Sequence, residues 1–217
     1  MAMLEHTARA EQILTDLVEY IGRDRELVRQ RCKSAMYELA WQWPKTKSTL
    51  DFYRESDLYI FDLTLYQAMM VPDVNYMVEE AEIHKFKKVL DFGGGIGEYT
   101  LRLIKEANAE VTFLELKDSK TLEYAKWRFK KYGIKPHIVN EDYTWQNEDW
   151  DAVVVMDVLE HLEDPKPVIE ALKKRAKNIY ANPEKVKYNQ YYPQHISHFE
   201  LDGFKNLEIN LYQNISK

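Results

Sequence analysis

The chain has 217 residues, of which 45% are hydrophobic and 30% charged, and its formal net charge is −6. This length allows one domain with a sizeable core, or one domain with a substantial appendage, and the acidic balance disfavours a general nucleic-acid binder. The longest apolar runs are too short for a membrane span and the first residues lack the features of a signal peptide, so we expect a cytoplasmic protein.

Residues 1–85 are predicted to form a helical extension, because apolar residues recur there at helical spacing and no glycine-rich turn interrupts them. Gly22 ends the first helix and Asp24 is a plausible cap for the second, which Pro44 ends. Two helices packed as a hairpin are the simplest interpretation. Cys32 is the only cysteine, which excludes an internal disulfide, and its place in the second helix predicts a buried structural thiol.

The rest of the extension is less regular. The segment 45–71 is rich in aromatic residues and predicts a mixture of loop and helix, after which Pro72 begins a helix that runs through Glu82. This helix leads into the first predicted strand at Lys88.

Residues 86–217 alternate between strand and helix patterns. Strands are predicted at 89–92, 111–114, 137–139, 152–156 and 178–181, with helices from 98, around 120–131 and from 167. This alternation predicts an α/β fold with a doubly wound, mostly parallel sheet and helices on both faces. The segment 207–212 is a further strand candidate.

The stretch 89–97 joins an apolar strand to an acid and to glycines at 93, 95 and 97. Such glycines allow a tight turn and close approach of the backbone to a ligand. Glu98 stands where the dinucleotide fingerprint requires its third glycine, which counts against NAD or FAD. Asp91 adds a carboxylate at the mouth of the turn, where it would repel a pyrophosphate but accept hydrogen bonds from a cationic, amino-acid-like group.

This stretch resembles the first motif of class I S-adenosylmethionine-dependent methyltransferases. Glu115 follows the second strand 22 residues after Gly93, where a carboxylate can accept from both ribose hydroxyls. The segment 138–143 is similar to the part that meets adenine, and 151–165 is similar to the fourth-strand motif of the family. The resemblance implies the following cofactor-binding residues: Asp91, Gly93, Gly95, Gly97, Glu115, Asp142, Tyr143 and Asp157.

The implied activity is transfer of a methyl group from S-adenosylmethionine to a small-molecule acceptor, with S-adenosylhomocysteine as the product. Because the sulfonium activates its own methyl group, the protein mainly has to position the reactants, and a general base matters most for a hydroxyl acceptor. His161, His195 and His198 are the candidate catalytic bases. His161 could instead hold the turn after the fourth strand by a backbone hydrogen bond. The pattern leaves open the acceptor atom and the oligomeric state.

Asp157, Glu160 and His161 also resemble the metal-binding E-x-x-E-H arrangement of some methyltransferases, including small-RNA 2′-O-methyltransferases. Carboxylates with histidine would suit Mg²⁺ or Mn²⁺. The first position here is the shorter Asp, so we assign no metal ligands.

Other interpretations follow from segments outside these motifs. The aromatic residues Tyr53, Tyr59, Phe61 and Tyr66 either line an acceptor pocket or pack the extension onto the core, and the extension could close over the crevice as a lid. The chain could also be a non-catalytic cofactor-binding subunit whose helices engage a partner protein. Seven basic residues between 166 and 187 favour a solvated face, with methylation of RNA or protein as the alternative.

Overall fold

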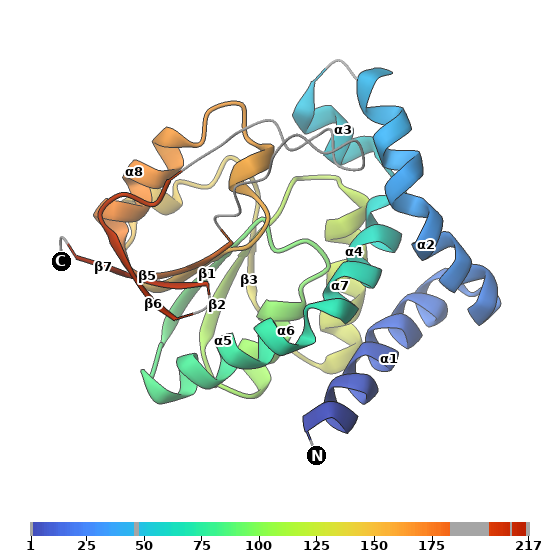
Figure 1. Ribbon diagram of the computed structural model, residues 1–217, viewed down its shortest axis with the longest axis horizontal. Helices are drawn as coiled ribbons and strands as arrows, with labels where there is room; N and C mark the ends of the chain where they lie inside the picture. The colour runs from blue at the N-terminus through green and yellow to red at the C-terminus, as the bar shows by residue number, and fades with distance from the viewer. Residues whose placement is uncertain (1, 46–47, 183–199, 209, 216–217) are drawn as a thin grey trace.

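The computed structural model describes residues 2–45, 48–182, 200–208 and 210–215. A mixed seven-stranded sheet lies at its centre in the order β3-β2-β1-β4-β5-β7-β6 (Figure 1). The first five strands are β1 (Lys88–Phe92), β2 (Glu110–Leu114), β3 (His137–Val139), β4 (Trp150–Val155) and β5 (Ala176–Ala181). Each of them runs parallel to its neighbours among the five, which confirms the predicted doubly wound, mostly parallel sheet.

Helices cover both faces of the sheet. One face packs against α5 (Val71–Ile83), α6 (Glu98–Lys105) and α7 (Lys120–Tyr132), and the other packs against α8 (Lys166–Arg175). Successive residues of β1 serve the two cores in turn, because side chains alternate along a strand. Val89 enters the core under α5 and α6, and Leu90 enters the core under α8. Short 3-10 turns lie at Trp43–Lys45, Trp145–Asn147 and Leu159–His161.

One prediction about the last strands of the chain is wrong. The segment 207–212 is not one strand, because the chain reverses between β6 (Phe204–Glu208) and β7 (Leu211–Asn214), which pair antiparallel. Asn210 lies in this reversal with a φ of +60°, a conformation that asparagine tolerates better than most residues. The apolar alternation continues across the turn, so the pattern alone concealed it.

Four helices precede α5: α1 (Ala2–Ile21), α2 (Arg25–Gln42), α3 (Thr49–Glu55) and α4 (Tyr59–Met69). The predicted cap is confirmed, because Asp24 accepts hydrogen bonds from two backbone N–H groups of the first turn of α2 at 2.9 and 3.2 Å. Cys32 is buried, as predicted, and burial raises the pKa of its thiol to about 11. In the described part of the chain, none of the helices is long and apolar enough to cross a bilayer.

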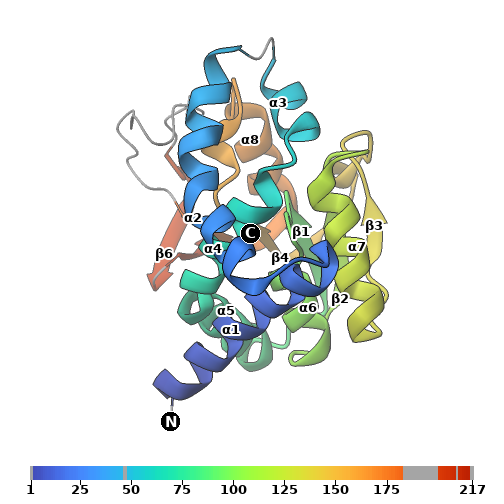
Figure 2. The ribbon, with the colours of Figure 1, turned by 90° about the vertical axis from the view of Figure 1, so that its right-hand side faces the viewer.

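The predicted hairpin of α1 and α2 is modified by α4, against which both helices pack more extensively than they do against each other (Figure 2). The same helices also contact the sheet half of the molecule. Ile13 and Leu17 of α1 share a buried cluster with Ile96 of the glycine turn and Tyr124 of α7. The N-terminal helices therefore pack directly on the segment that follows β1.

Candidate functional site

The glycine turn follows β1 and leads directly into α6. The backbone N–H groups of Gly93 and Gly94 both donate to the carbonyl of Leu114, at 2.9 and 3.1 Å, so the turn is fastened to the end of β2. Gly97 has a φ of +76°, and a Cβ on it would lie 2.5 Å from the ring of Phe129. Only glycine satisfies both conditions at this position.

Asp91 lies deeper than the sequence suggests. Its side chain is only 2% exposed and accepts hydrogen bonds from the backbone N–H of Thr100, at 3.2 Å, and from its hydroxyl, at 2.6 Å. Burial raises the pKa of the carboxyl to about 6 despite these two bonds. Asp91 therefore lies beneath the turn, where it fastens the start of α6, and not at its mouth.

Glu115 follows β2 and lies directly against the glycine turn. One carboxylate oxygen accepts from the backbone N–H of Gly95 at 2.6 Å, and the other accepts from the N–H of Leu116 at 2.9 Å. The pKa of this carboxyl is raised to about 7, mainly by burial and to a smaller extent by the nearby Asp91, although the two backbone hydrogen bonds lower it. The acid of the second strand and the glycines of the first are thus parts of one arrangement.

Asp142 and Tyr143 lie in the turn that follows β3. Asp142 is exposed, and its backbone N–H donates to the side chain of Asn140 at 3.0 Å. The hydroxyl of Tyr143 donates to Glu148, and its ring meets the ring of His137 edge-on with centroids 5.7 Å apart. Asp142 thus follows the carboxyl end of β3, the edge at which ligands of such sheets bind. The side chain of Tyr143 instead contacts the first residue of β3 and the residue two positions before β4, so it points toward the amino ends of these strands.

Asp157 and His161 follow β4, and each contacts a tyrosine from the N-terminal helices. The hydroxyl of Tyr66 in α4 donates to Asp157, which has a φ of +52°. The hydroxyl of Tyr53 in α3 shares a hydrogen bond with Nδ1 of His161, and the two rings pack edge-on with centroids 5.1 Å apart. Burial raises the pKa of both tyrosines. His195 and His198 lie outside the described residues.

The helices α3 and α4 lie over the carboxyl edge of the sheet, and we call these two helices the cover. Two further contacts join the cover to this edge. Leu63 lies against the turn so closely that a Cβ at Gly95 would be 3.2 Å from it. Arg54 donates to the carbonyl of Lys117 at 3.3 Å and to Glu141 at 2.9 Å. The cover thus contacts the segments that follow all of the first four strands. Sequence reasoning missed Leu63 and Arg54, and the aromatic richness of 45–71 was the only signal for this cover.

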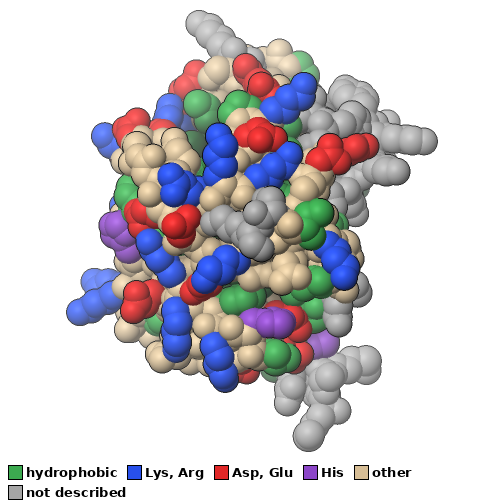
Figure 3. Space-filling view, turned by 90° about the vertical axis from the view of Figure 1, so that its left-hand side faces the viewer, with side chains coloured by type: hydrophobic (Ala, Val, Ile, Leu, Met, Phe, Trp, Pro, Cys, Tyr) green, Lys and Arg blue, Asp and Glu red, His purple; other side chains and the backbone are tan. Residues whose placement is uncertain are grey.

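Acidic and imidazole groups do not gather into a metal centre in the part of the chain that the structure describes, where no group of three such ligands occurs. Figure 3 shows Lys and Arg side chains interspersed with Asp and Glu side chains over one face of the molecule. Lys173 pairs with Glu170 and Lys177 pairs with Asp151, each at 2.8 Å. This arrangement agrees with the predicted solvated face for the described part of the stretch.

The comparisons with known proteins agree with this geometry. A family model described as a methyltransferase domain matches residues 90–178. The fold resembles an O-methyltransferase family protein from Burkholderia thailandensis, with a TM-score of 0.51 and 15% identity over 70% of this chain and 53% of that one. It also resembles the structure of PigF with SAH, with a TM-score of 0.53 and 15% identity over 77% and 54% of the two chains. Residues 90–178 therefore match a methyltransferase domain, and they lie in a methyltransferase-like α/β fold.

Curated proteins match part of the length of this chain. A ubiquinone biosynthesis O-methyltransferase from Vibrio atlanticus is 36% identical over 108 residues, which are 48% of this chain and 45% of the relative. One from Vibrio parahaemolyticus is 35% identical over 102 residues, which are 45% of this chain and 43% of the relative. The match thus spans less than half the length of these relatives.

Proposed function

We propose that this methyltransferase transfers the methyl group of S-adenosylmethionine to a small-molecule acceptor and releases S-adenosylhomocysteine. The observation that carries the proposal is the contact between Glu115 and the backbone of Gly95. A buried carboxylate with a raised pKa, held against a glycine turn at the carboxyl edge of a parallel sheet, is suited to accept hydrogen bonds from ribose hydroxyls.

The residues of the turn fit this cofactor. Gly95 and Gly97 let the turn pack closely, because a Cβ would lie 3.2 Å from Leu63 at Gly95 and 2.5 Å from Phe129 at Gly97. The family resemblance implies that the same glycines would face the cofactor. Glu115 would hold the ribose. Asp142 would accept from the exocyclic amine of adenine, as the family resemblance implies. Tyr143, which the resemblance puts beside the ring, would have to leave its contacts with His137 and Glu148 to reach it. Asp91 would act on the methionine end through the turn that it fastens, which revises the direct contact expected from the sequence.

The cover formed by α3 and α4 supports a small acceptor. Tyr53 and Tyr66 reach from these helices to His161 and Asp157, so an acceptor at the carboxyl edge of β4 would lie among aromatic and acidic side chains. The solvated basic face lies on the side of α8, which weakens the case for a nucleic-acid acceptor. The names of the curated relatives support oxygen as the acceptor atom.

Bound S-adenosylmethionine supplies a methyl group that is already activated by the adjacent sulfonium. The protein then has to hold the acceptor atom in line with that group, and such positioning can supply on the order of 7 to 11 kcal/mol. For a hydroxyl acceptor, His161 would take the proton at Nε2 while Nδ1–H donates to the Tyr53 oxygen. Tyr53 would then orient the imidazole. His195 and His198 stay candidates for the same role.

Calorimetric titration with S-adenosylhomocysteine tests the cofactor assignment. We expect S-adenosylhomocysteine to bind and NAD not to bind. We expect Glu115→Gln to lower the affinity for S-adenosylhomocysteine at least tenfold, because the loss of one hydrogen bond to a charged group costs on the order of 1.4 kcal/mol. Glu110→Gln is the matched control, because Glu110 is an exposed acid at the start of the same strand. If Glu115→Gln binds as tightly as wild type, the proposed site is wrong.

Turnover tests the role of His161. With phenolic acceptors, we expect His161→Ala to lower kcat by about 10²- to 10⁴-fold, the usual contribution of a general base. The measurement is the release of S-adenosylhomocysteine across pH 6 to 9. His84→Ala is the control, because His84 is exposed directly after α5, where it contacts Glu80. Equal rates for the two variants would remove His161 from the mechanism.

A further inference from the structure

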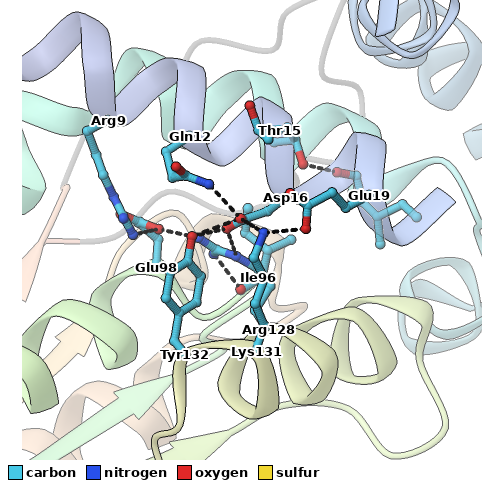
Figure 4. A network of polar contacts seen from close by, with 12 residues as sticks. Arg9, Gln12, Thr15, Asp16, Glu19, Ile96, Glu98, Arg128, Lys131 and Tyr132 are labelled. Atoms are coloured by element: carbon cyan, nitrogen blue, oxygen red, sulfur yellow. Dashed lines mark hydrogen bonds and ion pairs between the residues drawn. The ribbon is translucent and has the colours of Figure 1, made fainter. Parts of the chain in front are cut away.

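A buried cluster of charges lies where α1 meets the glycine turn (Figure 4). Arg128 of α7 is at its centre and is fully buried. Its Nε donates to Asp16 of α1 at 3.1 Å, and its Nη2 donates to Glu98, the first residue of α6, at 2.7 Å. Its Nη1 donates to the backbone carbonyl of Ile96 at 2.9 Å, so one guanidinium joins α1, α6 and the turn itself.

Each carboxylate of the cluster has further donors. Asp16 also accepts from Lys131 at 2.8 Å and from the hydroxyl of Tyr132 at 2.8 and 3.0 Å. Glu98 accepts two bonds from Arg9 of α1, at 2.7 and 2.8 Å. Burial by itself would raise the pKa of Asp16 and Glu98, but the neighbouring cations hold both pKa values below their usual range.

The arrangement makes the turn depend on α1. Arg128 and Glu98 are buried charges, and α1 supplies partners for both through Asp16 and Arg9. Ile13 and Leu17 of α1 also cover Ile96. If α1 leaves the surface, Arg128 loses one of its two carboxylate partners, and a buried charge without its partner is costly. The guanidinium of Arg128 would then rearrange, and its hydrogen bond to the Ile96 carbonyl, which holds the turn, would be weakened.

We infer that Asp16, Arg128 and Glu98 are positioning residues that couple the docking of α1 to the binding of S-adenosylmethionine at the glycine turn. The inference rests on the proposed function. Coupling of this kind is reciprocal: docking of α1 raises cofactor affinity, and bound cofactor stabilises docked α1 by the same factor. Residues of α1 thus set cofactor affinity without touching the cofactor.

Two variants that each remove one negative charge from α1 separate this coupling from general electrostatics. Asp16→Asn weakens the contact with Arg128, whereas Glu19→Gln removes an exposed partner of the same Lys131 and does not touch Arg128. We expect Asp16→Asn to weaken S-adenosylhomocysteine binding at least about fivefold, the lower end of typical coupling, and Glu19→Gln to change it less than twofold. Equal affinities for the two folded variants would overturn the inference.

Amide hydrogen exchange of the wild-type protein gives a second measurement that does not depend on the folding of a variant. Saturating S-adenosylhomocysteine should slow exchange in α1 by a larger factor than in α8, which packs on the other face of the sheet. Equal protection of the two helices means general stabilisation of the fold and contradicts the coupling. Absence of a binding signal for wild type in calorimetry would instead contradict the proposed function, and with it this inference.

Discussion

Replacement of Arg128 by Met is expected to lower the free energy of unfolding by about 3–5 kcal/mol, the usual cost of removing one partner from a buried ion pair. The variant leaves Asp16 and Glu98 buried with one cation fewer, and it also removes the donor to the Ile96 carbonyl. Met fills much of the volume of the arginine stem, so the loss reports the charge and not a cavity.

Urea unfolding of Arg128→Met beside Lys126→Met measures this effect. Lys126 is exposed on the same helix, so its replacement keeps the change in charge and helix propensity but leaves the cluster intact. We expect Lys126→Met to stay within about 0.5 kcal/mol of wild type, as surface substitutions usually do. A similar small effect for Arg128→Met would show that the cluster contributes little to stability.

The sheet and the glycine turn could be predicted from the sequence because both are determined locally. Apolar runs of strand length alternate with helical patterns after Lys88, and Gly97 needs a positive φ that few residues other than glycine adopt. The reversal at Asn210 was missed because its flanking residues keep the same apolar alternation. Boundaries of this kind depend on one residue and its turn geometry.

The sequence suggested that the extension could lie over the crevice, but the individual contacts of the cover and of the buried cluster could not be predicted, because they join residues far apart in the chain. Arg128 lies in an ordinary amphipathic helix, and its acidic partners are 112 and 30 residues away. Similarly, Tyr53 meets His161 across 108 residues. A sequence shows that such groups exist, but only the packing of α1, α3 and α4 on the sheet shows which of them are buried together.

Burial also explains why Asp91 lies deeper than the sequence suggests, whereas Glu115 lies against the glycine turn. The sequence put Asp91 at the mouth of the turn because it precedes Gly93 by two residues. In a strand covered on both faces, however, the side chain at this position points into the molecule, where Thr100 bonds it. Glu115 follows its strand and lies against the glycine turn, where it is 8% exposed and accepts from the backbone of Gly95.

The pH dependence of stability should report the cost of holding Glu115 at this edge. Burial raises the pKa of its carboxyl from 4.5 to about 7. A carboxyl with a raised pKa stabilises the fold fully below the unfolded pKa and loses this contribution as the pH rises through the folded pKa. Relative to wild type, Glu115→Gln should therefore gain stability between pH 4.5 and 8, by about 3 kcal/mol at 1.36 kcal/mol for each unit of pKa.

Urea unfolding of wild type, Glu115→Gln and the exposed control Glu110→Gln, at several pH values from 4.5 to 8, measures this difference. Carboxyls that do not interact with Glu115 cancel in the comparison, whereas Asp91, which interacts with it, contributes part of the difference. A difference between Glu115→Gln and wild type that stays constant with pH would contradict the raised pKa. A rising difference, together with the loss of S-adenosylhomocysteine affinity in the same variant, would mean that this carboxylate is kept for binding at the expense of stability.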